Sequence, residues 1–124
     1  RKQRDTYMNV DGALSGQVVE IHLLNGKRFL GKVLGQERDG VVVSCIPLRA
    51  LETMPPSGDV RRELEEMKQT LFIPWVGVEY LDIGGHPIGF NDLYAGWFGG
   101  ANVGDFFDAN YSSYRTDVEG SEFR

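Results

Sequence analysis

The sequence has little of what would classify a protein at once. It contains one cysteine, Cys45, among 124 residues, so an internal disulfide is excluded and a reducing, cytoplasmic setting is the default. No apolar run approaches the roughly 18–20 residues that a membrane-spanning helix needs. We therefore expect one cytoplasmic protein with an ordinary hydrophobic core and no membrane partner.

Basic residues are also scarce. The chain has 13 Lys and Arg against 18 Asp and Glu, a net charge of −5. Residues 84–124 hold only Arg115 and Arg124 as basic residues, against six acidic ones. Domains that bind duplex DNA usually present a basic stripe, and this sequence has none. Duplex DNA is therefore not an expected partner.

Residues for catalysis or metal binding do not cluster in the sequence. His22 and His86 share no ligand spacing with each other or with Cys45, which lies in an apolar run and is interpreted as a packed residue. Asp105 and Asp108 miss the spacing of a calcium loop and are interpreted as capping or turn residues. We expect no enzyme, no metal and no cofactor.

The first clear element is a strand over residues 17–24. Its side chains alternate, with apolar residues on one face and Glu20 and His22 on the other. Asn25-Gly26 follows, and this pair is the strongest short hairpin signal because both residues tolerate a positive φ. A half-buried strand that enters a tight hairpin is the prediction.

Two more strands are predicted over residues 27–37 and 41–48. Gly31 and Gly35 interrupt the first of them, which indicates a sharp bend or a bulge. Ahead of the sheet, the polar start of the chain predicts a short helix that ends near Leu14.

The next segment, residues 51–70, contains a predicted helix over about 59–70 with a narrow apolar stripe. This stripe could dock a partner or, as we favour, pack the inserted helix on its own domain.

Residues 71–75 and 76–83 then predict two short strands. They meet at a bend, because Pro74 cannot donate to a central ladder.

Together these elements predict a mainly β fold. It is a small, strongly bent, five-stranded antiparallel barrel with a short N-terminal helix and an inserted helix. The barrel is expected over residues 1–83, with the helical insertion at about 51–70. Residues 84–124 would form a C-terminal extension.

Two stretches resemble the Sm/LSm-like family of Hfq-related small β-barrels. The first is "VVEIHLLNGKRFLGKV", with Gly26 and Gly31 at the family's glycine positions, and the second is "FIPWVGVEYL", with Ile73, Val78 and Leu81 at its apolar positions. The resemblance spans about residues 6–83 and implies an SH3-like barrel that assembles into rings and binds single-stranded RNA.

The residues that contact RNA in this family are replaced here. Asp39 lies near the family's acidic position, but Gly40 or Val41 occupies the region of its asparagine, and Pro74-Trp75 stands in place of its Arg-Gly. We therefore take Asp39, Pro74 and Trp75 as candidates for an altered RNA site. Trp75 either stacks on a base or, as we favour, serves as a core or subunit-contact residue.

The resemblance also implies a cyclic homo-oligomer, in which strand four pairs with strand five of the neighbouring subunit. An apolar edge at the end of a small barrel needs such cover. The expected interface residues are Leu71, Phe72, Ile73, Val76, Val78 and Tyr80.

The extension over residues 84–124 holds 8 of the 16 glycines and 9 of the 14 aromatic residues. This composition fits either a sticky disordered tail or a segment held by contacts with the barrel or a neighbour. We favour the second and predict Trp97, Phe98, Phe106 and Phe107 as anchors.

The leading hypothesis is a non-enzymatic, ring-forming Sm-like protein that binds single-stranded RNA or another chain through an altered site. The alternative is a structural or assembly component of a virion or larger complex, in which the barrel serves oligomerisation alone. The acidic, aromatic extension favours this alternative.

Overall fold

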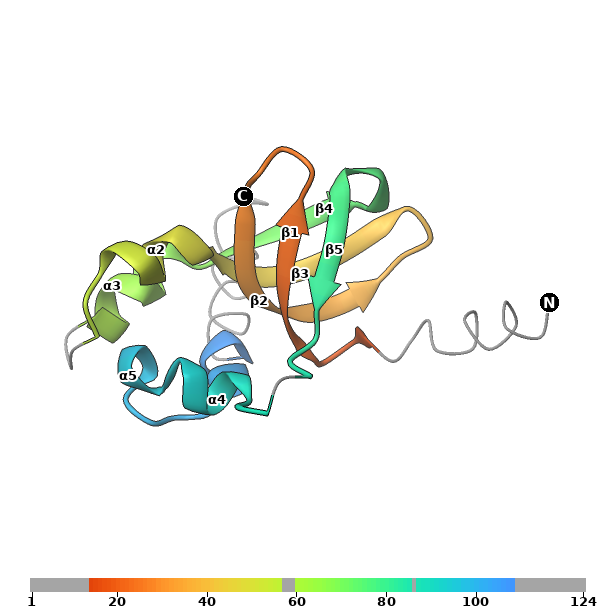
Figure 1. Ribbon diagram of the computed structural model, residues 1–124. Coiled ribbons are helices and arrows are strands. Elements are labelled where there is room, and N and C mark those ends of the chain that lie inside the picture. The colour runs from red at the N-terminus through yellow and green to blue at the C-terminus, as the bar shows by residue number, and fades with distance from the viewer. Residues whose placement is uncertain (1–13, 57–59, 86, 109–124) are drawn as a thin grey trace, which may run out of the picture.

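The computed structural model describes residues 14–56, 60–85 and 87–108 (Figure 1). It is mainly β, as predicted: a five-stranded antiparallel sheet with several short helices beside it. Within these ranges, no helix has the length and apolar character to cross a membrane. The predicted N-terminal helix lies outside the described residues except for its last residue, Leu14.

Three strands form where the sequence predicts them: β1 (Val18–Leu23), β2 (Arg28–Gln36) and β3 (Gly40–Pro47). β1 and β2 pair antiparallel through the predicted hairpin. Gly26 lies in that turn with a φ of 91°, a left-handed conformation that glycine adopts without steric cost. The Asn25 side chain accepts a hydrogen bond from the backbone N–H of Lys27 at 2.9 Å and so supports the same turn.

The predicted bend of β2 is present. A bulge interrupts its pairing with β3 between Val33 and Gly35. At Gly31, an added Cβ atom would lie 2.4 Å from the carbonyl oxygen of Ser44 and 2.5 Å from the Cβ of Cys45. Only glycine therefore lets β2 and β3 approach this closely.

The last two strands are β4 (Gln69–Pro74) and β5 (Val78–Asp82), joined by the 3-10 turn η2 (Trp75–Gly77). The predicted break at Pro74 is thus a turn between two short strands. β4 pairs with β3 and β5 pairs with β1, which gives the order β4-β3-β2-β1-β5. The sheet is not closed into the expected barrel, because β4 and β5, the two ends of this order, do not pair within the described ranges.

Two helices lie between β3 and β4: α2 (Leu48–Thr53) and α3 (Val60–Met67). α3 confirms the predicted inserted helix, which is shorter than expected because β4 begins at Gln69. α2 was not predicted, since Pro47 marks the end of a strand in the sequence. In the structure Pro47 ends β3 in an extended conformation and is also the N-cap residue of α2, which begins at Leu48.

The C-terminal segment adds α4 (Phe90–Leu93), α5 (Ala95–Phe98) and a helix over residues 103–108. Figure 1 shows these helices together beneath one face of the sheet, with α3 beside them. The segment after residue 83 therefore packs on its own chain as far as it is described.

Buried residues form two clusters, one on each face of the sheet. The inner core lies within the bend of the sheet and the outer core lies between the sheet and the helices. The inner core contains Val19, Ile21, Val33, Val41, Val43, Cys45 and Ile73. The outer core contains Leu30, Ile46, Leu48, Ala50, Leu51, Val60, Leu64, Phe90, Tyr94, Phe98, Val103, Phe106 and Phe107.

The polar face of β1 belongs to the outer side. Glu20 pairs with Leu30 of the outer core across β1 and β2. Sequence alternation suggests that this face is solvated, but Glu20 is only 9% exposed because the C-terminal helices cover it. Cys45 is packed in the inner core as predicted, and burial raises the pKa of its thiol to about 12.

Candidate functional site

The structure brings the predicted RNA-site residues Asp39 and Trp75 together at one end of the sheet. The backbone N–H of Trp75 donates to the carbonyl oxygen of Asp39 at 3.0 Å. The indole N–H donates to the carbonyl oxygen of Glu37, also at 3.0 Å. Trp75 is half-buried against the inner core, and Pro74 is exposed beside it. Trp75 therefore fastens η2 to the turn between β2 and β3.

This end of the sheet is poorly equipped to bind phosphate. The turn between β2 and β3 carries the exposed residues Glu37, Arg38 and Asp39, so its single cation stands between two acids. The indole N–H of Trp75 is already used within the chain. These contacts favour the structural interpretation of Trp75 over base stacking.

The predicted interface residues lie on β4, η2 and β5, and their exposure differs. Phe72 is 51% exposed, Val76 86% and Tyr80 51%, which is unusual for apolar and aromatic side chains of this size. Leu71 and Val78 are half-buried against the inner core. Ile73 must be removed from the set of contact side chains, because the chain's own inner core buries it to 5% exposure.

Leu24 joins the exposed apolar residues and was missed from the sequence. It is 67% exposed at the tip of the β1–β2 hairpin. Its backbone N–H donates to the carbonyl oxygen of Gly77 at 2.9 Å, which fastens the hairpin tip to η2 beside Val76. Its position directly before the Asn25-Gly26 turn is the sequence signal that could have identified Leu24 as an exposed apolar residue.

The four predicted tail anchors all lie in or against the outer core. Phe98, Phe106 and Phe107 are fully buried, and Trp97 is partly buried against the same cluster. The Nζ of Lys68 lies 4.0 Å from the ring centroid of Phe106 and donates to its carbonyl oxygen at 2.7 Å. Burial lowers the pKa of Lys68 to about 8.

A hollow that we call the hairpin pocket lies at the end of the β1–β2 hairpin, with a volume of about 440 Å³. It combines three cations with one aromatic side chain. Arg28 is held by two contacts of 2.8 Å to the carboxylate of Glu52, which raise the pKa of Arg28 and lower that of Glu52. Its lining residues are Gly26, Lys27, Arg28, Phe29, Pro47, Arg49 and Gln69.

A second hollow, the outer-face pocket, lies between β1, α2 and the helices α4 and α5, with a volume of about 530 Å³. Glu20 forms its polar centre. The hydroxyl of Tyr94 donates to one carboxylate oxygen, and the Nε2 of His22 lies 3.3 Å from the other. The lining residues are Glu20, His22, Arg28, Leu48, Leu51, Glu52, Tyr94 and Trp97.

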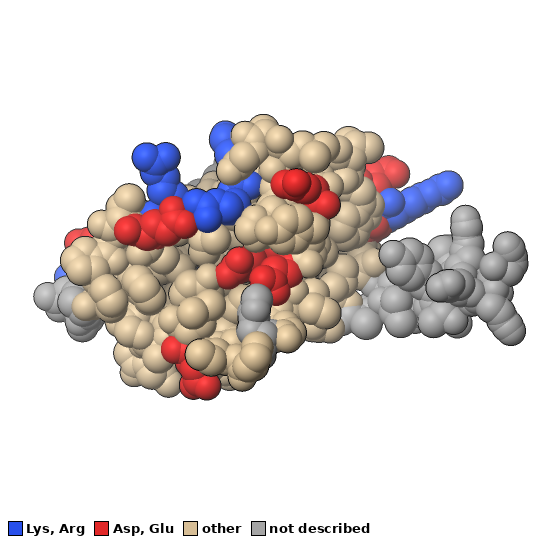
Figure 2. Space-filling view, in the orientation of Figure 1, with Lys and Arg blue, Asp and Glu red and all other residues tan. Residues whose placement is uncertain are grey.

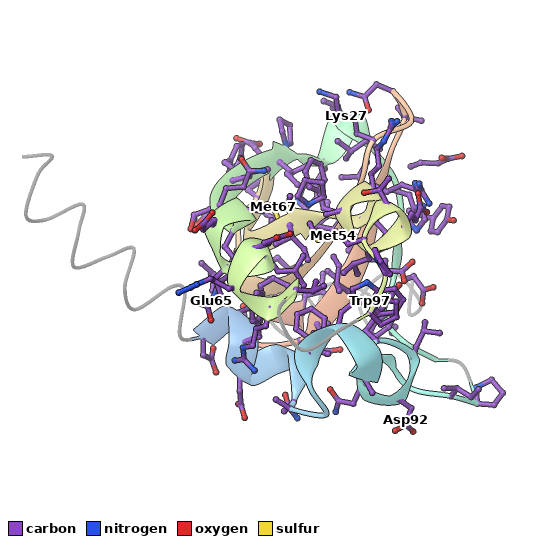
Figure 3. The ribbon with its side chains drawn as sticks, turned by 90° about the vertical axis from the view of Figure 1, so that its left-hand side faces the viewer. Lys27, Met54, Glu65, Met67, Asp92 and Trp97 are labelled. Atoms are coloured by element: carbon purple, nitrogen blue, oxygen red, sulfur yellow. The ribbon has the colours of Figure 1, made fainter. Side chains whose placement is uncertain are left out.

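The two pockets differ in the charge around them. Figure 2 shows Lys and Arg side chains gathered near α2 and the hairpin, and a group of Asp and Glu side chains lower on the same face, between the strands and the helices beneath them. Figure 3 shows Lys27 at the hairpin tip and Trp97 between α2 and the C-terminal helices. In the described part of the chain, no three His, Cys, Asp or Glu residues are placed to hold a metal ion.

The chain matches no protein-family model, and no curated protein is similar to it.

Proposed function

We propose that this chain is an Sm-like protein that assembles into a closed ring by pairing β4 of one subunit with β5 of the next. The observation that carries the proposal is that β4 and β5 are the two ends of the sheet order, and that exposed apolar or aromatic residues lie on β4 (Phe72), on β5 (Tyr80) and on η2 between them (Val76). The resemblance of the two sequence motifs to the Sm/LSm family supports the same arrangement.

Backbone hydrogen bonding and burial of apolar surface both favour the pairing of β4 with β5. An edge strand offers unpaired N–H and C=O groups that a further strand can satisfy. Burial of apolar surface adds about 25 cal/mol per Å². Because β4 and β5 are different edges, their contact is head-to-tail, and such contacts generate a ring when the rotation closes. The C-terminal helices pack on the sheet face of their own chain and leave both edges available.

Native mass spectrometry of the full chain tests the assembly. We expect one closed species larger than a dimer. Phe72→Glu and Val76→Glu should each convert it to monomer with little loss of fold, because both side chains are largely exposed in the single chain. Leu93→Glu is the matched control, since Leu93 is 46% exposed on α4, away from the edges, and should leave the assembly intact. A monomeric wild-type chain, or an assembly that survives both edge variants, would overturn the proposal.

Single-stranded RNA is the second candidate, at the hairpin pocket rather than at Trp75. The specific observation is that Lys27, Arg28 and Arg49 line one hollow together with Phe29. Cations that follow the backbone and an aromatic ring that stacks on a base are the usual means of binding single strands. Two of these three cations, Lys27 and Arg49, are exposed.

Fluorescence anisotropy with U-rich and A-rich RNA at moderate salt tests this candidate. We expect the double variant Lys27→Glu/Arg49→Glu to weaken binding at least tenfold, because charge-assisted contacts to phosphate supply much of such affinity. Arg62→Glu removes another exposed cation, on α3, and should have a much smaller effect. Absence of binding at roughly tens of micromolar protein, about −6 kcal/mol, would contradict the RNA hypothesis.

A further inference from the structure

We propose that the outer-face pocket binds an organic cation of the guanidinium class, of the kind that an arginine side chain of another polypeptide presents. All the residues that line this site belong to a single chain. A buried carboxylate, the aromatic rings around it and the charge of the surrounding residues support this assignment.

The carboxylate of Glu20 is the first element. Glu20 is 9% exposed and lies on β1 beneath the C-terminal helices. Its two close side-chain contacts do not supply a permanent positive charge: Tyr94 donates as a phenol, and His22 is charged only when protonated. A buried carboxylate is costly without a cation partner, and its oxygens can accept more hydrogen bonds than these two contacts provide.

Tyr94 is fixed in the role of a neutral donor. Burial, followed by its hydrogen bond to Glu20, raises the pKa of the phenol well above its ordinary value. The negative charge at this point therefore stays on the carboxylate side of the pair. A positive group that enters the pocket would meet that charge on a carboxylate that is only 9% exposed.

Aromatic rings form the walls of the pocket. The rings of Tyr94 and Trp97 lie 6.1 Å apart at an interplanar angle of 64°. The indole of Trp97 is held in place because its N–H donates to the carbonyl oxygen of Met54 at 2.7 Å. The ring of His22 also lines the pocket, and Tyr80, which is outside the lining, stacks on it with ring centroids 4.2 Å apart. Rings held this rigidly favour a cation, and a planar guanidinium both stacks on them and donates to a carboxylate.

The surrounding charges also select a cation. Glu52 stands at the rim as a second carboxylate, and Asp82 contributes negative potential at Tyr94. Arg28 is the one positive residue in the lining, and its guanidinium is already paired with Glu52. Because the charges of Arg28 and Glu52 offset each other, the net charge of the lining is that of Glu20, which repels an anion and attracts a guanidinium. A guanidinium ligand would compete with Arg28 for these carboxylates.

The tryptophan indole signals in the NMR spectrum of the ¹⁵N-labelled full chain report on binding. The chain has two tryptophans, so Trp97→Phe assigns both signals. During titration with Nα-acetyl-arginine amide, we expect the Trp97 signal to shift and the Trp75 signal to remain still, because Trp75 lies at the inner-core end of the sheet. The neutral isostere Nα-acetyl-citrulline amide should shift neither signal. Equal shifts with the two compounds, or no shift of the Trp97 signal, would overturn the proposal.

Three variants localise the site. Glu20→Gln keeps the shape and an oxygen acceptor for Tyr94, and should weaken binding about tenfold. Glu79→Gln removes an exposed carboxylate on β5 and should leave binding unchanged. Arg28→Gln removes the competing guanidinium and should strengthen binding about threefold. Binding by Glu20→Gln as tight as that of the folded wild type would contradict the site, and equal or tighter binding of spermidine would contradict the guanidinium class.

Discussion

Replacing Phe106 with alanine is expected to lower the free energy of unfolding by about 3–5 kcal/mol. Phe106 is fully buried in the outer core, and its ring packs edge-on against Phe98 at 4.8 Å and Phe107 at 5.1 Å. Alanine would remove all of these contacts and leave a cavity in the outer core. Lys68 would also lose the ring above which its Nζ lies.

Equilibrium unfolding in urea measures this loss, with Phe72→Ala as the matched control. The chemical change is the same, but Phe72 is 51% exposed on the edge strand β4. The control should cost below about 1 kcal/mol when measured on the monomer, as expected for surface substitutions away from a core. Similar losses for the two variants would show that the C-terminal helices do not form a core with the sheet.

The same outer core gives a reason to regard residues 84–108 as part of the fold. Phe98 and Phe106 share one cluster with Leu30 of β2 and Ile46 of β3. Lys32 of β2 also forms an ion pair of 2.6 Å with Asp108. We therefore expect the sheet and these helices to unfold in a single transition, since neither surface is covered without the other.

The elements that sequence predicts well are those that local chemistry dictates. The hairpin at Asn25-Gly26 follows from the preference of these residues for a positive φ. The break between β4 and β5 follows from Pro74, which has no N–H to donate. Both signals act over a few residues, so the rest of the chain need not be known.

The elements that sequence misses depend on distant residues. Glu20 belongs to a regular alternation that ordinarily means a solvated face. Tyr94, 74 positions further along the chain, donates to its carboxylate and helps to bury it. No local pattern contains that contact, and the covering helices are too short for a helical period to reveal them.

The candidate site also combines features that the sequence predicts with features that only the fold reveals. Family resemblance directs attention to Asp39, Pro74 and Trp75, and the structure does bring them to one place. It also shows that the indole N–H of Trp75 is satisfied within the chain, which a sequence cannot reveal. The two pockets are assembled from residues on at least three elements each, so only the fold could bring their cations and carboxylates together.

Replacing Gly31 with alanine is expected to destabilise the chain by about 3 kcal/mol, at the upper end of what overpacking costs. The new Cβ would lie 2.4 Å from the carbonyl oxygen of Ser44 and 2.5 Å from the Cβ of Cys45. Neither obstacle is the end of a flexible side chain, so β2 and β3 themselves must separate. That movement would loosen the inner core on one face and shift Leu30 of the outer core on the other.

Gly35→Ala is the control for this prediction, because an added Cβ at Gly35 meets nothing within 4 Å. We expect its urea midpoint to change by the equivalent of less than about 1 kcal/mol. Cys45→Ala should not rescue Gly31→Ala, since alanine retains the Cβ atom that clashes. Rescue by that second substitution would place the strain in the thiol rather than in the approach of the strands. A neutral Gly31→Ala would mean that the close approach of β2 and β3 does not depend on this glycine.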